Sequence, residues 1–110
     1  MAYAFVQTLH GMEDDDYAAI RAAIDEALGG MPPAGLVLHV AGPVPGGYRY
    51  LDLWESEAAW QRFHDDVVHP ALERAGIVGP GAKPIRVEAE ALDGVADVWG
   101  AAVPAGPAAA

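Results

Sequence analysis

The chain contains no cysteine. Disulfide bonds, thiol nucleophiles and thiolate metal ligands are therefore excluded. It also lacks any run approaching the roughly 20 consecutive apolar residues that a membrane helix requires. Its first residues, MAYAFVQTLHG, do not combine the basic region and the long apolar region of a secretory signal. We therefore expect a cytoplasmic protein that does not have a membrane as a partner.

Basic residues are scarce, because 6 lysines and arginines stand against 16 acidic residues and give a net charge of -10. Proteins that bind nucleic acid use a basic surface to neutralise phosphates, and a chain this acidic is repelled by them. The same repulsion acts at anionic lipid surfaces. We expect no nucleic acid partner, and we interpret the acidic surface as a source of solubility.

Apolar residues are plentiful and make up 53% of the 110 residues. This apolar fraction is enough for the core of one domain, and a chain of this length is too short for two domains. We expect a single domain over residues 1–92. The remaining residues, 93–110, are biased towards alanine, glycine and proline and are predicted to form a tail.

Four segments have the composition of strands, and two have helical spacing. The strands are predicted at residues 2–9, 35–42, 47–54 and 85–92. The first helix is expected to begin at the acidic run 13–16, which suits the positive end of a helix dipole better than it suits a metal site, and to end at Gly29. The second is expected to begin after the cap Ser56, to be distorted at Pro70 and to end at Gly76.

This order of elements is β-α-β-β-α-β. It is typical of a ferredoxin-like sandwich, an α+β fold in which a four-stranded antiparallel sheet carries both helices on one face. The short loop 43–46 is expected to join the second and third strands as an antiparallel hairpin.

Alternation along this hairpin separates two faces of the sheet. The aliphatic face is predicted to contain Leu36, Leu38, Val40, Leu51 and Leu53, and the aromatic face His39, Tyr48, Tyr50, Asp52 and Trp54. Pairing Gly42 with Gly47 would place His39 opposite Tyr50, whereas a shift of two residues would place it opposite Asp52 or Tyr48. Because helices cover only one of two largely apolar faces, we expect a second copy of the chain to cover the other in a homodimer.

The four histidines differ in their expected surroundings. On a helical wheel His64 falls in the apolar arc of the second helix with Trp60 and Phe63, whereas His69 lies on the polar side. His10 is expected in a loop, and His39 lies on the aromatic face of the sheet. Buried histidines are more often satisfied core residues than catalytic groups.

Two inward histidines near a carboxylate and a tyrosine also permit a catalytic interpretation. A histidine fixed by Asp52 has a defined tautomer and can act as a general base near neutral pH. Tyr50 can donate to a developing oxyanion. Four candidate catalytic residues follow: His39, His64, Asp52 and Tyr50. Trp54, Trp60 and Phe63 are expected to shape an apolar slot for a ligand, with Gln7 of the first strand also contributing.

The order of elements and the stretch LDLWESEAAWQRF, residues 51–63, resemble the antibiotic biosynthesis monooxygenase-like group of dimeric α/β-barrel proteins. The resemblance covers residues 2 to about 91. It implies a homodimer whose sheets form a barrel, with a small-molecule pocket between sheet and helices. It also implies an activity such as cofactor-independent oxygenation of polycyclic aromatic polyketides. Related dimeric barrels cyclise polyketides, isomerise small acids, degrade haem or have no known activity.

The haem-degrading members resemble this chain at Trp54, Glu55 and Ser56, but they use an asparagine in the first strand and a tryptophan and a histidine along the second helix. The corresponding residues here are Gln7, Phe63 and Glu73, so the axial ligand is missing unless His64 replaces it. The set of His39, His64 and Asp52 has ligand types that suit iron, but the spacing does not establish a site. We expect no haem, no non-haem iron and no other bound cofactor.

Two functions remain open from the sequence. The first is a cofactor-free enzyme, an oxygenase or a cyclase or isomerase of an aromatic or polyketide-like substrate, in which a histidine abstracts a proton. The second is a non-catalytic homodimer that binds a hydrophobic ligand or acts as an accessory protein. Fold alone does not separate them. The arrangement of His39 and His64 around a cavity does discriminate.

Overall fold

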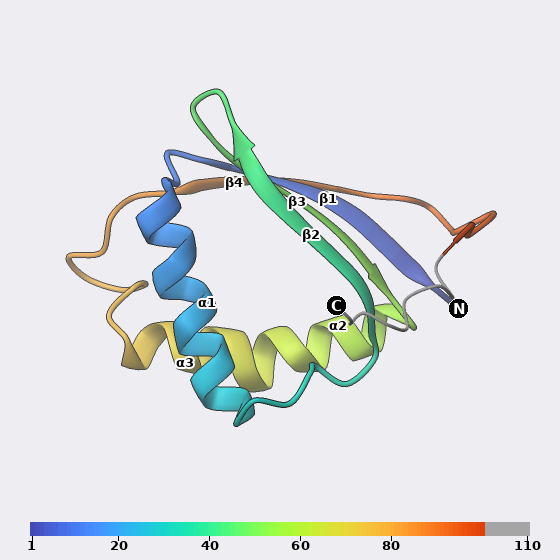
Figure 1. Cartoon of the computed structure of the whole chain (residues 1–110), viewed down its shortest axis with the longest axis horizontal. Helices are drawn as coiled ribbons and strands as arrows, with labels where there is room; N and C mark the ends of the chain where they lie inside the picture. The colour runs from blue at the N-terminus through green and yellow to red at the C-terminus, as the bar shows by residue number, and fades with distance from the viewer. Residues whose placement is uncertain (101–110) are drawn as a thin grey trace.

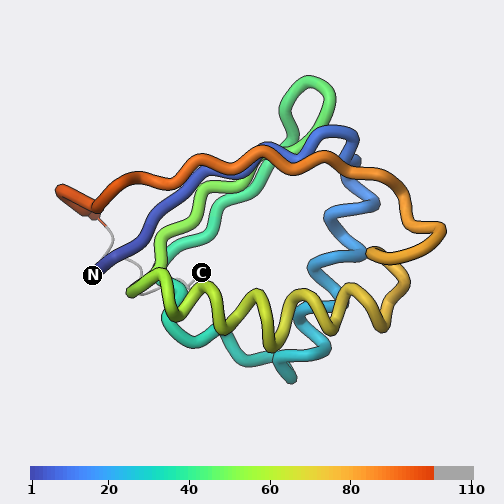
Figure 2. The backbone as a smooth tube through the Cα atoms, turned by 180° about the vertical axis from the view of Figure 1, so that it is seen from behind, coloured from blue at the N-terminus to red at the C-terminus, as the bar shows by residue number. Residues whose placement is uncertain are grey.

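The computed structural model describes residues 1–100. A four-stranded antiparallel sheet has the order β2-β3-β1-β4. Its strands are β1 (Tyr3–His10), β2 (Leu36–Val44), β3 (Gly47–Trp54) and β4 (Arg86–Ala91). In both Figure 1 and Figure 2 every helix lies on the same side of the sheet. The expected ferredoxin-like α+β fold is confirmed.

The helix α1 (Asp14–Leu28) begins at the acidic run as expected. The backbone N–H of Glu13 donates to the carboxylate of Asp16 over 2.8 Å. Lys83 Nζ lies 3.3 Å from the carboxylate of Glu13 and 2.5 Å from that of Asp16. These ion pairs join the loop before β4 to the start of the helix. At the other end Gly29 has a φ of 63°, a conformation that glycine adopts at little cost.

The second helical segment is divided, which the sequence predicted only as a distortion at Pro70. It consists of α2 (Glu57–Phe63), a π-helical turn η1 (His64–Val68) and α3 (His69–Arg74). The Ser56 hydroxyl accepts from the Ala59 N–H over 3.1 Å and begins α2 as expected. In η1 the N–H of His69 donates to the carbonyl of His64, five residues earlier. Pro70 follows directly and has no N–H of its own to continue the α-helical pattern.

The register of the central hairpin differs from the pairing of Gly42 with Gly47. Val44 pairs with Gly47, so the turn contains only Pro45 and Gly46, and β2 extends two residues beyond its expected end at residue 42, whereas β3 has its expected bounds. Gly46 has a φ of 79°, which this tight turn requires. The register is the one shifted by two residues, and it places His39 directly opposite Asp52.

Two further placements correct the sequence analysis. A β-bulge between Leu36 and Leu38 pairs Leu36 with Trp54, so Leu36 packs on the helix-covered face and not with Leu38. His10 is not in a loop. It is the last residue of β1, and it pairs with Gly47 on one side and Arg86 on the other.

The buried core lies on the helix-covered face in two clusters. One contains Phe5, Trp54 and Ala59, and the other contains Leu9, Met12 and Tyr48. The opposite face of the sheet is covered by no part of residues 1–100 in either view (Figures 1 and 2). Several large apolar side chains on it are exposed: Val6, Val40 and Leu51.

Residues 93–100 contain no helix or strand, and the rest of the predicted tail, residues 101–110, lies outside the described part of the chain. No helix formed by residues 1–100 is both long enough and apolar enough to cross a membrane.

Candidate functional site

A cavity of about 770 Å³ lies between the helices and the sheet. All eight residues that the sequence proposed for catalysis or ligand binding line it: Gln7, His39, Tyr50, Asp52, Trp54, Trp60, Phe63 and His64. The aromatic face of the hairpin is therefore the face beneath the helices. Alternation along the strands separates the two faces but does not decide which of them the helices cover.

His39 and Asp52 form the polar centre of the cavity wall. They are direct partners across β2 and β3, and the distance from His39 Nδ1 to Asp52 Oδ1 is 2.7 Å. The second carboxylate oxygen, Oδ2, accepts from the Trp54 indole N–H over 3.0 Å. Because a carboxylate only accepts, the neutral His39 ring carries its proton on Nδ1, and Nε2 is the basic nitrogen.

Among residues 1–100, Asp52 is the one charged residue that is buried, with 7% of its surface exposed. Burying a carboxylate without partners costs several kcal/mol, and here His39 and Trp54 supply a donor to each oxygen. The side chain of His39 keeps 25% of its surface exposed towards the cavity. The arrangement therefore joins an oriented, accessible imidazole to a carboxylate behind it.

Tyr17 of α1 completes this wall and is a site residue that the sequence analysis did not propose. Its hydroxyl lies 3.2 Å from His39 Nε2. Its ring is stacked on Tyr48 at 5.2 Å and meets Tyr50 edge-on at 5.7 Å. The available signal was that a tyrosine on the sheet-facing stripe of a helix brings a hydroxyl to the buried face.

Tyr50 has a separate environment from the other groups. Its ring meets the imidazole of His39 edge-on at 5.2 Å, but its hydroxyl donates to the sulfur of Met12 over 3.6 Å. Burial, followed by the negative charge of nearby groups, raises the pKa of Tyr50 well above its usual value. Tyr50 is therefore a neutral hydroxyl whose present partner is only a weak acceptor.

His64 lies on the helical side of the cavity and does not contact His39. Its ring lies 5.5 Å from that of Trp60, and its Nδ1 is 3.2 Å from the carboxylate of Asp65, the next residue. The side chain is 44% exposed. The two histidines therefore line one cavity without forming a pair. Residues 1–100 contain no group of three or more His, Asp or Glu side chains that could hold a metal ion.

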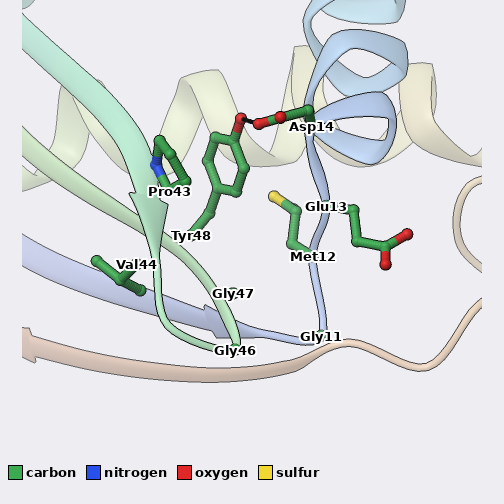
Figure 3. A pocket seen from close by; sticks show the side chains of 9 residues that line it. All are labelled: Gly11, Met12, Glu13, Asp14, Pro43, Val44, Gly46, Gly47 and Tyr48. Atoms are coloured by element: carbon green, nitrogen blue, oxygen red, sulfur yellow. Dashed lines mark hydrogen bonds between the residues drawn. The ribbon is translucent and has the colours of Figure 1, made fainter.

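A smaller pocket of about 380 Å³ lies at the start of α1 and against the hairpin turn (Figure 3). In it the Tyr48 hydroxyl donates to the carboxylate of Asp14. That hydrogen bond raises the pKa of Tyr48 to about 12. Tyr48 does not line the larger cavity, and its contribution there is to support the ring of Tyr17.

No family model and no curated protein matches the chain. Similar solved structures include SnoaB from Streptomyces nogalater, described as a cofactor-independent oxygenase, with 13% identity, a TM-score of 0.58 and coverage of 89% of this chain and 97% of that one. A Caulobacter crescentus protein assigned as an antibiotic biosynthesis monooxygenase has 20% identity, a TM-score of 0.56 and coverage of 86% and 90%. Rv0793 from Mycobacterium tuberculosis has 15% identity, a TM-score of 0.54 and coverage of 88% and 100%.

The chain has the fold of antibiotic biosynthesis monooxygenase-like proteins. At these identities the likeness establishes the fold, so the resemblance seen in residues 51–63 is confirmed at that level. In this monooxygenase-like fold the helix position expected for a haem ligand is Glu73. Its side chain is 60% exposed and lies 3.6 Å from His69, and it does not line the cavity.

Proposed function

We propose that this protein binds a small aromatic or otherwise hydrophobic molecule in the cavity and abstracts a proton from it with His39 as the general base. The reaction is cofactor-independent oxygenation of an aromatic or polyketide-like substrate, or its cyclisation or isomerisation. The observation that carries the proposal is the 2.7 Å contact between His39 Nδ1 and Asp52, which leaves Nε2 as a base on the cavity side. The cofactor-independent oxygenase SnoaB, which shares the fold, supports the same class of chemistry.

The residues have distinct roles in this proposal. The substrate proton passes to the imidazole, and Asp52 stabilises the imidazolium that forms. Tyr50 turns its hydroxyl from the Met12 sulfur to the oxyanion that develops on the substrate, because a sulfur acceptor competes poorly with an anionic oxygen. Trp54, Trp60 and Phe63 hold the apolar part of the substrate, and Gln7 of β1 contacts it from the sheet. In the oxygenase form of the reaction the carbanion reacts with dioxygen, which is the oxidant.

The active form in this proposal is a homodimer. Val6, Val40 and Leu51 are between 38% and 50% exposed on the sheet face opposite the cavity. A second copy of this face buries these side chains without blocking the cavity, which lies on the other side of the sheet.

A non-catalytic ligand-binding or accessory role is the second candidate. It is favoured by one observation, that both nitrogens of His39 already have partners, Asp52 and Tyr17. In that case His39 is a satisfied group of the cavity wall and the aromatic residues alone bind the ligand.

Substitution of single histidines distinguishes the two functions. With anthrone as an oxidisable tricyclic substrate, we expect His39→Asn to reduce oxygen uptake by about 100-fold or more, because general base catalysis contributes that much. His64→Asn is the matched control on the same cavity, and we expect a change of less than about threefold because His64 contacts neither His39 nor Asp52. Anthrone binding by both variants without oxygen uptake by the unmodified protein would favour the non-catalytic role.

A further inference from the structure

The polar wall of the cavity is a chain of hydrogen bonds that converge on the carboxylate of Asp52. Trp54 donates to Asp52 Oδ2, and His39 Nδ1 donates to Asp52 Oδ1. Since the proton of neutral His39 is on Nδ1, Nε2 has only a lone pair. The 3.2 Å contact at Nε2 is therefore a hydrogen bond that the Tyr17 hydroxyl donates.

The donor at Nε2 is held in place by packing. Tyr17 lies nearly parallel to Tyr48, with 12° between the ring planes, and Tyr50 closes the other side at 72°. Tyr48 is itself fixed by its hydrogen bond to Asp14 (Figure 3). A ring fixed by two neighbours cannot leave Nε2 without disturbing the core cluster to which Tyr48 belongs. Substrate therefore reaches the base through the oxygen of Tyr17.

A positively charged side chain is the next neighbour of Tyr17 along its helix. Arg21 lies one turn further along α1 and lines the same cavity. Its pKa is raised first by its hydrogen bond to Asp25, at 3.0 Å, and then by the hydroxyl of Tyr17. Arg21 and Tyr17 stand four residues apart on α1, so the guanidinium is a helical neighbour of the Tyr17 side chain and places a positive charge on the same cavity wall.

We propose that Tyr17 is a further catalytic residue, which accepts the substrate proton at its oxygen while it passes its own proton to His39 Nε2. The step forms one O–H bond at Tyr17 and one N–H bond at His39. It breaks the substrate C–H or O–H bond and the former O–H bond of Tyr17. His39 becomes an imidazolium beside Asp52, the substrate becomes a carbanion or enolate if a C–H bond is broken and a phenolate if an O–H bond is broken, and nothing is oxidised.

The relay rests on the proposed proton abstraction and specifies its substrate class. A substrate must present an acidic hydroxyl, or a C–H flanked by aromatic rings or a carbonyl, to the Tyr17 oxygen while its apolar body lies against Trp60 and Phe63. Tyr50 does not serve as this relay, because its hydroxyl is directed to Met12 and its pKa is raised by burial.

Deuterium exchange tests the relay without requiring oxidation. Anthrone is incubated with the protein in deuterated water without oxygen, and incorporation at its acidic methylene is followed by mass spectrometry. We expect Tyr17→Phe to slow the catalysed exchange by about 100-fold or more. Tyr3→Phe is the matched control, because it keeps its ring against Phe5 and loses the hydroxyl of a tyrosine that does not line the cavity, so its exchange rate should remain within about twofold of the unmodified rate.

A relay of two groups also predicts non-additive losses. Tyr17→Phe and His39→Asn should each lose about as much as the double variant, because both belong to one step. In ¹⁵N spectra of the histidine rings, Tyr17→Phe should shift the Nε2 resonance of His39 and leave the Nδ1 proton in place. This readout is independent of any substrate.

Three results would overturn the relay. The first is a deuterium exchange rate in Tyr17→Phe that equals or exceeds the unmodified rate, which would mean that the Tyr17 hydroxyl only blocks access of the substrate to His39. The second is an Nε2 resonance that does not respond, and the third is no catalysed exchange by the unmodified protein. Oxygen uptake measured separately keeps the two proposals distinct, since exchange without uptake retains the relay and removes the oxygenase.

Discussion

Asp52 joins the packing of the core to the chemistry of the cavity. One of its oxygens accepts from Trp54, which is 1% exposed and belongs to a core cluster, and the other accepts from His39 at the cavity. The orientation of the imidazole is therefore set by a residue that packing already holds. Such a carboxylate cannot move without leaving a buried donor unsatisfied, at a cost of about 1–3 kcal/mol.

The sequence predicted much of this site because strand alternation is a strict geometric rule. His39, Tyr50, Asp52 and Trp54 share a face whichever of the weighed registers is correct. Tyr17 could not be assigned in the same way. Helical periodicity locates its ring on the inner face of α1, but the position of its hydroxyl depends on how α1 is placed over the sheet.

Tyr48 predicts a pH dependence of stability. Its pKa is raised to about 12 by the hydrogen bond to Asp14, whereas an unfolded tyrosine titrates near its model value of 10.0. Between these values the unfolded state binds fewer protons, so the stability that the neutral hydroxyl contributes is present below pH 10 and is lost as the pH rises towards 12. Urea unfolding at pH 8 to 12 should show a steeper alkaline loss for the unmodified protein than for Tyr48→Phe.

The appropriate control is Asp14→Asn, which keeps the tyrosine and removes the carboxylate. We expect it to flatten the alkaline slope in the same direction as Tyr48→Phe, because the anion is the main cause of the raised pKa. Parallel slopes for all three proteins would show that Tyr48 titrates alike in the folded and unfolded chains.

At the scale of elements, the hairpin of β2 and β3 shows which structural features the sequence pattern predicts and which it does not. Its strands and faces follow from composition and alternation, but its register depends on how few residues make the turn. Pro45 and Gly46 suffice, so Val44 and Gly47 pair. The bulge that moves Leu36 to the side of Trp54 likewise follows from packing against the helices and has no marker in a run of apolar residues.

Gly47 is the position at which this hairpin tolerates no side chain. A Cβ there would lie 2.2 Å from the carbonyl oxygen of Leu9 and 3.2 Å from the Cα of His10, both in the backbone of the paired strand β1. Because backbone atoms of a central strand cannot withdraw, we expect Gly47→Ala to lower the free energy of unfolding by about 2 kcal/mol or more. Urea denaturation followed by circular dichroism measures the change.

Gly94 provides the matched control, since a Cβ there meets nothing within 4 Å and its φ is not in the left-handed region. We expect Gly94→Ala to change the free energy of unfolding by less than about 0.5 kcal/mol. Equal stability of the Gly47 and Gly94 variants would mean that β1 and β3 are not in the register described.

At the scale of the whole molecule, the two faces of the sheet differ in the residues that they present. The face beneath the helices has the cavity, the buried Asp52 and both core clusters. The other face has aliphatic side chains over β1, β2 and β3, whereas β4 contributes Arg86, Glu88 and Glu90 at its edge. The sequence predicts this division because helices on one side of the sheet leave the other side without cover. Which copy or partner covers it is decided by contacts between molecules.

The proposed homodimer predicts a sharp response to charge on this open face. Leu51 is 46% exposed near the middle of the face, in the central strand β3, and a lysine there would place an unpaired cation in an apolar interface. We expect the unmodified protein to be a dimer by light scattering after size exclusion, and Leu51→Lys to raise the dimer dissociation constant by at least about 100-fold. Val78→Lys, in the loop before β4, changes an apolar residue that is 36% exposed away from the sheet and should leave the dimer intact.

A monomeric unmodified protein, or equal dissociation of the two variants, would contradict an interface on this face. Because the cavity lies on the other side of the sheet, anthrone should still bind to the Leu51→Lys monomer.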